Sequence, residues 1–221
     1  MASSIDGRTL LNRWRPQGSV AEGLIESVYQ QLDVDAWIVG RTTGEEYAKG
    51  KPYPAYSQEQ FQRQAYFARR DAKAYGVVLD PKGKISWGRS DVDGDPVVVI
   101  LTEQVADGHL AGLRADGVSY LFAGKSTIDL SLALDTLGRG LGVKRLLLQG
   151  GGITNAAFLR AGLVDEISLI VFPTVDGVDG APSVFQSNES DCGPASKVKA
   201  ITLTDHTRLD GGPVWLRYAV Q

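Results

Sequence analysis

Apolar residues predict strands that alternate with helices through the second half of the chain. Four short apolar runs are typical of buried strands: 97–101, 118–122, 145–149 and 166–172. Between the second and third runs, leucines recur every three or four residues, which predicts a helix capped by Thr127: Leu130, Leu134, Leu137 and Leu141. This alternation predicts a parallel sheet covered by helices.

The first half carries a similar but less regular pattern. Apolar residues at every fourth position from 20 to 32 predict a helix, with Ser19 as its N-cap. The elements expected after it are a strand at 34–39, a short helix at 61–70, a strand at 75–79 and a turn at 80–83.

The C-terminal part breaks this alternation. Apolar runs at 198–203 and 214–220 are separated by a polar loop with no helical pattern, so they predict an antiparallel hairpin at the sheet edge. The sequence therefore predicts an α/β fold with a mixed, mostly parallel sheet flanked by helices. A length of 221 residues suits a single domain covering residues 1–221.

Three consecutive glycines, Gly150, Gly151 and Gly152, separate the strand expected at 145–149 from a helix expected at 154–163. Glycines let a backbone approach a ligand closely, and the amides and dipole at a helix N-terminus attract an anion such as a pyrophosphate. The glycines could equally form only a sharp connection. A Rossmann site is not expected, because it would need a glycine at Asn155 and an acidic residue closing the next strand.

Composition narrows the function classes. A net charge of −3 and a pI near 5.4 predict no basic surface for nucleic acid. Cys192 is the only cysteine, so an internal disulfide is excluded and a cytoplasmic location is expected. No apolar run approaches the ~20 residues of a membrane span. We expect His109 and His206 to be surface or capping residues and no metal site to form.

The stretch Leu-Leu-Leu-Gln-Gly-Gly-Gly-Ile-Thr-Asn at 146–155, followed by Phe-Leu-Arg-Ala-Gly-Leu-Val-Asp-Glu at 158–166, resembles a known family. It is similar to the reductase domain of bacterial riboflavin-biosynthesis proteins, the RibD C-terminal family, whose fold is dihydrofolate-reductase-like. Ser4-Ile-Asp-Gly-Arg8 and Gly40-Arg-Thr-Thr43 also match motifs of such reductases. The resemblance covers most of residues 3–185, with little of it at 58–89.

The resemblance implies NADPH as cofactor, with Arg41 near the adenosine 2′-phosphate. The residues expected to bind the cofactor are Gly40, Arg41, Thr42, Thr43, Thr102, Gly150, Gly151, Gly152, Ile153 and Thr154. The residue pattern by itself leaves open that Arg41 is a solvated charge and Thr43 a helix cap.

On the substrate side, the resemblance implies that Ser4 and Asp6 line the pocket, although Asp6-Gly7 could be only a hairpin turn. Trp14 is expected to be an exposed aromatic residue in a polar loop whose two arginines could hold an anionic group. Gln149 stands where the family usually has glutamate, and an amide does not titrate, so Gln149 is expected to orient substrate. Asp6 remains the candidate for proton handling, which would require partial burial and a raised pKa.

The sequence departs from the family after Thr43. The usual Asp-x-Pro-x-Leu-x-x-Arg run, which helps to hold a phosphoribosyl substrate, is replaced at 45–56 by a run with tyrosines and prolines, expected to form a rigid aromatic loop over a pocket.

The resemblance implies an NADPH-dependent reductase that passes hydride to an imine-like or carbonyl-like carbon. The most direct assignment is a homodimeric 5-amino-6-(5-phosphoribosylamino)uracil reductase. The alternatives are a reductase of a pterin, a dihydrofolate-like compound or another cyclic imine, and a non-catalytic nucleotide-binding protein.

Overall fold

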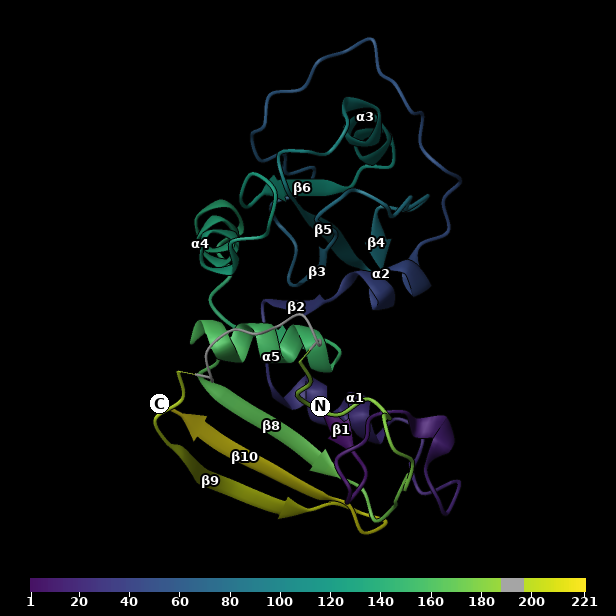
Figure 1. The fold of residues 1–221 in the computed structure, drawn as a ribbon, viewed down its shortest axis with the longest axis vertical. Helices are drawn as coiled ribbons and strands as arrows, with labels where there is room; N and C mark the ends of the chain where they lie inside the picture. Colours follow the sequence, from purple (N-terminus) through teal and green to yellow (C-terminus); the bar gives the residue numbers. More distant parts are fainter. Residues whose placement is uncertain (188–196) are drawn as a thin grey trace. The chain divides into compact units, whose positions relative to one another are not determined.

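The structure, a computed structural model, describes residues 1–187 and 197–221 (Figure 1). Cys192, on which the expected compartment partly depends, lies outside the described residues. The chain divides into two compact units, which are described separately. The first unit comprises Met1–Asp33 and Gly151–Gln221, and the second comprises Val34–Gly150. The single domain expected from the sequence remains a prediction.

Parallel strands form the frame of the second unit. They are β2 (Ala36–Val39), β3 (Tyr75–Leu79), β5 (Asp95–Leu101), β6 (Ser119–Phe122) and β7 (Leu146–Leu148). Their order is β7-β2-β3-β5-β6, and the short β4 (Asp91–Val92) pairs with β5 in the antiparallel direction. All of β5 after Asp95 is buried, as expected for a strand covered on both faces. The parallel arrangement predicted from the alternating pattern is therefore confirmed in this unit.

Three helices belong to the second unit: α2 (Arg41–Tyr47), α3 (Asp107–Ala115) and α4 (Leu130–Leu141). A Cβ atom at Gly44 would lie 2.4 Å from Cγ1 of Val78, so the absence of a side chain lets α2 lie against β3. The N-cap of α4 is Asp129, whose carboxylate accepts a hydrogen bond from the amide of Leu132. The expected cap, Thr127, is therefore wrong by two residues.

The segment 48–74, all of which the structure describes, forms no helix, so the helix expected at 61–70 is wrong. The guanidinium of Arg63 donates to the carbonyls of Phe61, Glu103 and Val105 and pairs with Asp107 at 2.6 Å. The guanidinium of Arg114, on α3, lies 4.7 Å from the ring centre of Phe61 and 4.4 Å from that of Tyr66. These tertiary contacts outweigh the local helical preference of the segment.

Tyr53 packs against α3 instead of covering a pocket. A Cβ atom at Gly112 would lie 2.3 Å from the Tyr53 ring, so the ring rests directly on the helix backbone. The Tyr53 hydroxyl donates to Asp116 (2.6 Å) and accepts from the Trp87 amide (2.9 Å), and burial raises its pKa. The ring centre of His109 lies 5.0 Å from that of Tyr53, and the residue is 9% exposed and does not cap α3, so the expectation of a surface or capping residue is wrong for His109.

The first unit contains a four-stranded sheet of order β1-β8-β10-β9. Its strands are β1 (Ala2–Ser3), β8 (Glu166–Val171), β9 (Ile201–Arg208) and β10 (Val214–Val220). β1 runs parallel to β8, and β9 and β10 form the predicted antiparallel hairpin, with β10 against β8 and β9 at the edge. The hairpin is confirmed.

The helices of the first unit are the 3-10 helix η1 (Leu11–Arg13), α1 (Leu24–Gln31) and α5 (Gly152–Ala161). α1 begins after Gly23, whose φ of 74° interrupts the chain before the helix, so Ser19 is not its N-cap. The Ser19 hydroxyl instead donates to the carbonyl of Pro16 (2.9 Å). Gly162, at φ 71°, ends α5 as predicted.

The contact between Tyr53 and Asp116 should stabilise the second unit measurably. Tyr53→Phe leaves the Asp116 carboxylate and the Trp87 amide without this partner, so the free energy of unfolding in urea should fall by roughly 1–3 kcal/mol. The matched control is Tyr56→Phe, because Tyr56 is 90% exposed. Equal effects of the two substitutions would show that the buried hydroxyl contributes no stability.

Candidate functional site

The carboxyl ends of β2 and β7 bring several expected residues to one edge of the second-unit sheet. Ile38 pairs with Leu148 in register, and the Gln149 amide donates to the Ile38 carbonyl (3.0 Å). Gln149, which is half-buried, therefore lies beside the segment that leads from β2 to Gly40 and Arg41. Open parallel sheets bind ligands outside the carboxyl ends of their strands, so this edge is a candidate binding region.

Arg41 is the first residue of α2 and is exposed, and its guanidinium pairs with the carboxylate of Glu45 one turn later. Thr42 and Thr43 lie in the first turn of the helix. The N-cap position belongs to Gly40, so the alternative that Thr43 is the cap is wrong. Gly40 has no side chain that could accept a hydrogen bond from the first-turn amides, so an acceptor on a ligand could bind them.

Thr102, the first residue after β5, is 1% exposed. Its hydroxyl (2.7 Å) and its amide (3.1 Å) both donate to the carbonyl of Pro81. The Thr102 side chain therefore holds the 80–83 turn in place, and a cofactor contact at Thr102 or the following turn stays a prediction.

Asp80, treated in the sequence as a turn residue only, is fully buried at the end of β3. One carboxylate oxygen accepts from the amides of Lys84 (2.6 Å) and Ile85 (2.8 Å), while the other has no hydrogen-bond partner among the described residues. The sequence signal for this role is an acidic residue directly after a wholly apolar run. A polar side chain at the end of a buried strand needs hydrogen-bond partners, so it is expected to bind nearby amides.

Ser4 and Asp6 form a hydrogen-bonded anchor for a distant loop of the first unit. The Ser4 hydroxyl donates to the Asp6 carboxylate (2.6 Å), which also accepts from the amides of Asp176 (3.1 Å) and Gly177 (2.9 Å). These bonds, that of Ser4 first, hold the pKa of Asp6 well below its ordinary value, and the side chain is exposed. The expectation of a partly buried carboxyl with a raised pKa is therefore wrong.

Trp14 is 2% exposed, so the expectation of an exposed aromatic residue is also wrong. Its ring packs against Phe172 with ring centres 5.4 Å apart. The neighbouring cations have other partners, since Arg13 pairs with Asp176 (3.0 Å) and Arg15 donates to the Trp14 carbonyl (2.9 Å). The indole therefore lies in the interior. The flanking guanidinium groups bind the Asp176 carboxylate and the backbone carbonyl of Trp14.

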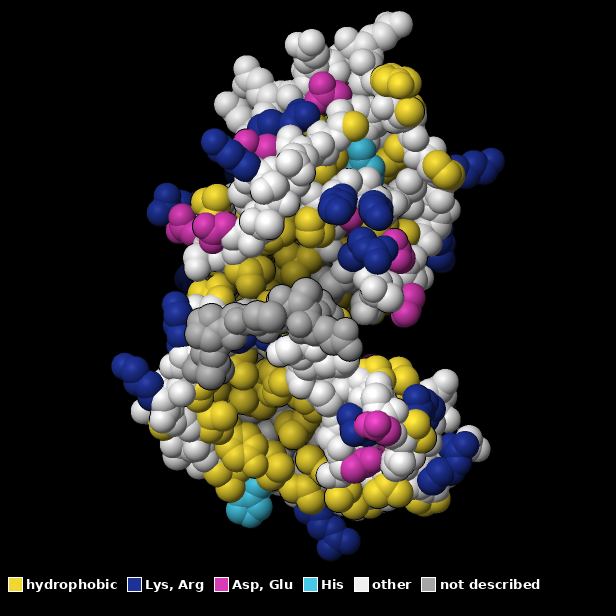
Figure 2. All heavy atoms as spheres, in the orientation of Figure 1, with side chains coloured by type: hydrophobic (Ala, Val, Ile, Leu, Met, Phe, Trp, Pro, Cys, Tyr) yellow, Lys and Arg dark blue, Asp and Glu magenta, His cyan; other side chains and the backbone are white. Residues whose placement is uncertain are grey.

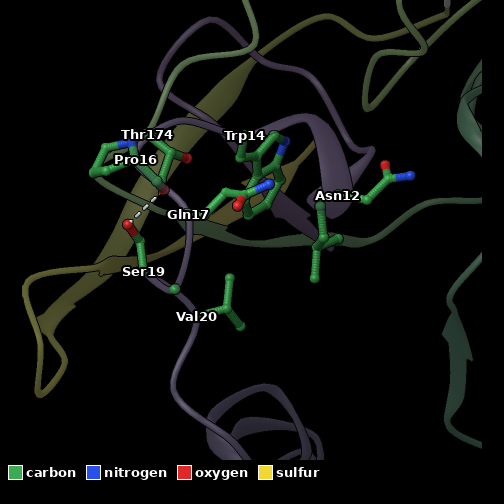
Figure 3. Close-up of a pocket in the computed structure, with 9 residues that line it drawn as sticks. Asn12, Trp14, Pro16, Gln17, Ser19, Val20 and Thr174 are labelled. Atoms are coloured by element: carbon green, nitrogen blue, oxygen red, sulfur yellow. Dashed lines mark hydrogen bonds between the residues drawn. The ribbon is translucent and has the colours of Figure 1, made fainter.

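A cavity of about 320 Å³ lies beside Trp14 within the first unit (Figure 3). Its lining residues are Leu11, Asn12, Trp14, Pro16, Gln17, Gly18, Ser19, Val20 and Thr174. Trp14 Nε1 and Thr174 Oγ1 are buried and have no hydrogen-bond partner among the described residues. Both atoms have almost no accessible surface, so they lie beneath the lining of the cavity and do not face it. Sequence reasoning missed Thr174, for which no local signal exists.

The N-terminus of α5 gives the glycines different roles. Gly151, at the N-cap, is exposed, and no heavy atom lies within 4 Å of a Cβ placed on it. A Cβ at Gly152 would lie 2.2 Å from the Ser183 carbonyl oxygen, so Gly152 is required by packing. Ile153 is 44% exposed and Thr154 is half-buried. Uncapped amides beside open space suit a phosphate group, so this helix end fits the expected cofactor.

Other classes of site find little support in the described part of the chain. Residues 1–187 and 197–221 contain no group of three or more His, Cys, Asp or Glu side chains arranged to hold a metal ion. Within the same residues, no helix combines the length and apolar character needed to cross a membrane. On the face drawn in Figure 2, Lys and Arg side chains are scattered, and Asp and Glu side chains lie among them.

Two curated relatives that match part of the chain are named as reductases. A curated relative from Methanothermobacter thermautotrophicus, named 2,5-diamino-6-ribosylamino-4(3H)-pyrimidinone 5′-phosphate reductase, is 35% identical over 85 residues, which are 38% of this chain and 38% of that protein. A protein of the same name from Aquifex aeolicus is 30% identical over 89 residues, 40% of this chain and 39% of that protein. The chain thus matches about two fifths of the length of these relatives.

The fold has a counterpart among solved structures. A pyrimidine reductase-like protein from Corynebacterium diphtheriae is similar with a TM-score of 0.69 at 21% identity, over all of this chain and 89% of that one. This similarity concerns the fold alone, and it confirms the predicted α/β, dihydrofolate-reductase-like class. A family model described as the RibD C-terminal domain matches residues 1–213. The chain therefore belongs to the RibD C-terminal domain family.

Proposed function

We propose that this chain is an NADPH-dependent reductase that transfers hydride to an imine-type or carbonyl-type carbon of a ribosylaminopyrimidine 5′-phosphate. The family and the names of the two curated relatives support the reductase activity and the substrate class. The structural observation that carries the proposal is the α5 N-terminus, where Gly151 leaves open space beside uncapped amides.

Bound NADPH would supply hydride, and with it two electrons, while a proton taken up on nitrogen or oxygen completes the reduction of the C=N or C=O bond. The guanidinium of Arg41 could bind the 2′-phosphate in a fork. The first-turn amides of α5 could bind the pyrophosphate. The cofactor residues of this proposal are Gly40, Arg41, Thr42, Thr43, Gly150, Gly151, Gly152, Ile153 and Thr154, with Thr102 acting through the 80–83 turn.

Gln149 and Asp6 have different roles in this proposal. The Gln149 amide can donate and accept hydrogen bonds but cannot titrate, so it orients substrate at the carboxyl end of β7. Asp6 positions the loop at 174–177 through the amides that its carboxylate binds. The proton then comes from water or from the substrate, because a carboxyl with a lowered pKa is ionised at neutral pH and is a weak proton donor.

Two substrates of the same class fit the proposal. The sequence resemblance implies 5-amino-6-(5-phosphoribosylamino)uracil, while the names of the curated relatives favour the corresponding 2,5-diaminopyrimidinone, which carries an amino group at ring position 2. NADPH binding is followed by fluorescence, and its oxidation by absorbance, with each compound and with dihydrofolate. Oxidation with a ribosylaminopyrimidine supports the proposal. Oxidation with dihydrofolate alone contradicts the substrate class, and NADPH binding without oxidation favours a nucleotide-binding protein.

We also propose a homodimer, a cytoplasmic location and a single catalytic domain of residues 1–221. Figure 2 shows hydrophobic side chains gathered over the sheet of the first unit. Ile201 and Leu203, on the edge strand β9, are about half exposed. Exposed apolar surface of this kind is typical of protein interfaces and supports the homodimer. The absence of a second cysteine supports a reducing compartment.

Arg41 should distinguish NADPH from NADH. Arg41→Ala removes a charge-assisted contact worth ~1.5–3 kcal/mol, so the Kd for NADPH should rise roughly 10-fold to 100-fold while that for NADH stays nearly unchanged. Glu45→Gln removes the carboxylate that pairs with Arg41 and should tighten NADPH binding. Arg139→Ala is the matched control, because Arg139 is an exposed arginine with its own i,i+4 partner, Asp135. Equal losses for both cofactors would place Arg41 away from the 2′-phosphate.

The two glycines at the start of α5 should respond differently to substitution. Gly151→Val places a side chain in open space, so the protein should remain folded by circular dichroism but lose NADPH binding. Gly152→Val drives a side chain into the Ser183 carbonyl and should lower the melting temperature. Normal NADPH binding by a folded Gly151→Val variant would show that the glycines serve only the connection.

Asp6→Asn tests positioning against proton transfer. The lowered pKa keeps Asp6 ionised even at pH values below the usual aspartate range, so the carboxylate contributes to the fold throughout neutral pH and its contribution is lost only in strong acid. Between pH 5 and 9 the variant should keep the shape of the kcat profile, while the KM for substrate rises roughly tenfold, the scale of one charge-assisted contact. Asp179→Asn, on an exposed turn, is the control. Loss of one limb of the profile would identify Asp6 as the proton donor.

A further inference from the structure

The first turn of α5 is tied to a neighbouring segment of the first unit, residues 181–187, here called the strap. The Gly152 carbonyl accepts a hydrogen bond from the Gln186 amide (3.0 Å), and the Asn155 side-chain amide donates to the Val184 carbonyl (2.8 Å). Because Gly152 has no side chain, the strap lies directly on the helix backbone. The position of this turn therefore depends on the strap.

The strap also binds the N-terminal segment of the same unit. Arg8 and Ser183 form an antiparallel bridge, and the Arg8 guanidinium donates to the Ala181 carbonyl (2.7 Å). The Thr9 amide donates to the Pro182 carbonyl (3.0 Å). One continuous set of hydrogen bonds therefore joins the N-terminal segment to the first turn of α5.

The N-terminal segment carries Ser4 and Asp6, which are expected to line the substrate pocket. The Ser4 amide donates to the Arg8 carbonyl (2.9 Å), and the Arg8 amide donates to the Ser4 hydroxyl (3.0 Å). The Ser4 hydroxyl donates in turn to the Asp6 carboxylate (2.6 Å). The strap thus connects the residues expected on the substrate side with the amides proposed to bind the cofactor.

Asn155 is a buried polar residue within a helix, and this placement has a cost. The residue is 2% exposed, and its Oδ1 atom has no hydrogen-bond partner among the described residues, so the bond from Nδ2 is what offsets its desolvation. Leucine is of similar size, has no polar group to desolvate and is a better helix former. Helix stability alone therefore favours an apolar residue here, whereas binding the Val184 carbonyl requires a donor.

The bond made by Asn155 acts close to the amides of the proposed cofactor site. The backbone amide of Asn155 donates to the carbonyl of Gly151, the N-cap, at 3.0 Å, which closes the first helical turn around the amides of 152–154. Groups that hold reacting molecules must keep their geometry closely, since a misplacement of about 1 Å can lower a rate roughly 100-fold. A side chain that fixes this turn therefore affects what the turn binds.

We infer that Asn155 is a positioning residue, which through the strap fixes the first turn of α5 relative to the N-terminal segment that carries Ser4 and Asp6. With this bond in place, the amides that bind the cofactor phosphates and the residues on the substrate side keep one relative placement within the first unit. The assignment rests on the proposed function for the identity of the two ligands.

The test is Asn155→Leu in the full chain. Loss of the donor should release the strap, so the Kd for NADPH, measured by fluorescence, should rise roughly fivefold to tenfold, the scale of one hydrogen bond. In the protein without NADPH, hydrogen exchange followed by NMR should become faster at the Gln186 amide and at the Thr9 amide, because the strap binds both. Asn12→Leu is the matched control, since Asn12 is exposed, and it should change neither quantity.

A second variant changes the strap and leaves the sequence of α5 intact. Ser183→Ala removes the bond from the Ser183 hydroxyl to the Phe185 carbonyl (2.7 Å) within the strap. It should weaken NADPH binding and speed exchange at Thr9 in the same direction as Asn155→Leu. Circular dichroism confirms that each variant is folded.

The outcomes separate positioning from general stability and from the proposed activity. Normal NADPH binding by folded Asn155→Leu overturns the inference, as does faster exchange at Gln186 without a change at Thr9. Equal acceleration at the Ile170 amide, which donates to the Met1 carbonyl elsewhere in the unit, would show only lost stability and also overturns it. If the wild-type chain binds no NADPH, the proposed function fails, and faster exchange confined to Gln186 and Thr9 still supports the positioning role.

Discussion

Asp35 aligns three parallel strands of the second unit. Its carboxylate accepts from the amides of Lys144 and Arg145, at 2.8 Å each, and its carbonyl accepts from the amide of Tyr75 at 3.1 Å. These bonds fix the amino ends of β7, β2 and β3 at one level, and parallel pairing then brings their carboxyl ends to one edge. The Arg145 amide, followed by that of Lys144, lowers the pKa of Asp35, so the carboxylate remains ionised at neutral pH. The placement of Gln149 beside Gly40 follows from this alignment.

The same contact recurs elsewhere in the chain. Asp6 binds the amides at 176 and 177, and Asp80 binds those at 84 and 85, so three aspartates each hold two consecutive backbone amides. Such a carboxylate is an acceptor that fixes a loop or a strand end, and its negative charge strengthens the bonds that it accepts. The carboxylates near the candidate site are therefore suited to positioning. A reductase built in this way would rely on its cofactor for the chemistry and on its hydrogen bonds for orientation.

Tertiary contacts explain where the expected helices were misplaced. The helix predicted at 61–70 is absent because Arg63 and Arg114, whose partners lie in other elements, hold that segment in an irregular conformation. The predicted N-caps Ser19 and Thr127 were wrong for a local reason. Several residues near the start of a helix can serve as its N-cap, and the backbone conformation selects one of them. Hydrophobic spacing identified the existence of α1 and α4 but not their first residues.

The sequence by itself determined the strands, the C-terminal hairpin, the strand that leads through glycines into α5, and the family. These features depend on periodicity and backbone freedom, which are properties of neighbouring residues. Only the tertiary structure decided that Trp14 is buried and that Thr174 lines the same cavity. It also decided that Asp6 is an ionised loop anchor. The partners lie 160 residues apart for Trp14 and Thr174 and 170 residues apart for Asp6 and Asp176, and hydrogen bonding and packing between such distant segments leave no local pattern in the sequence.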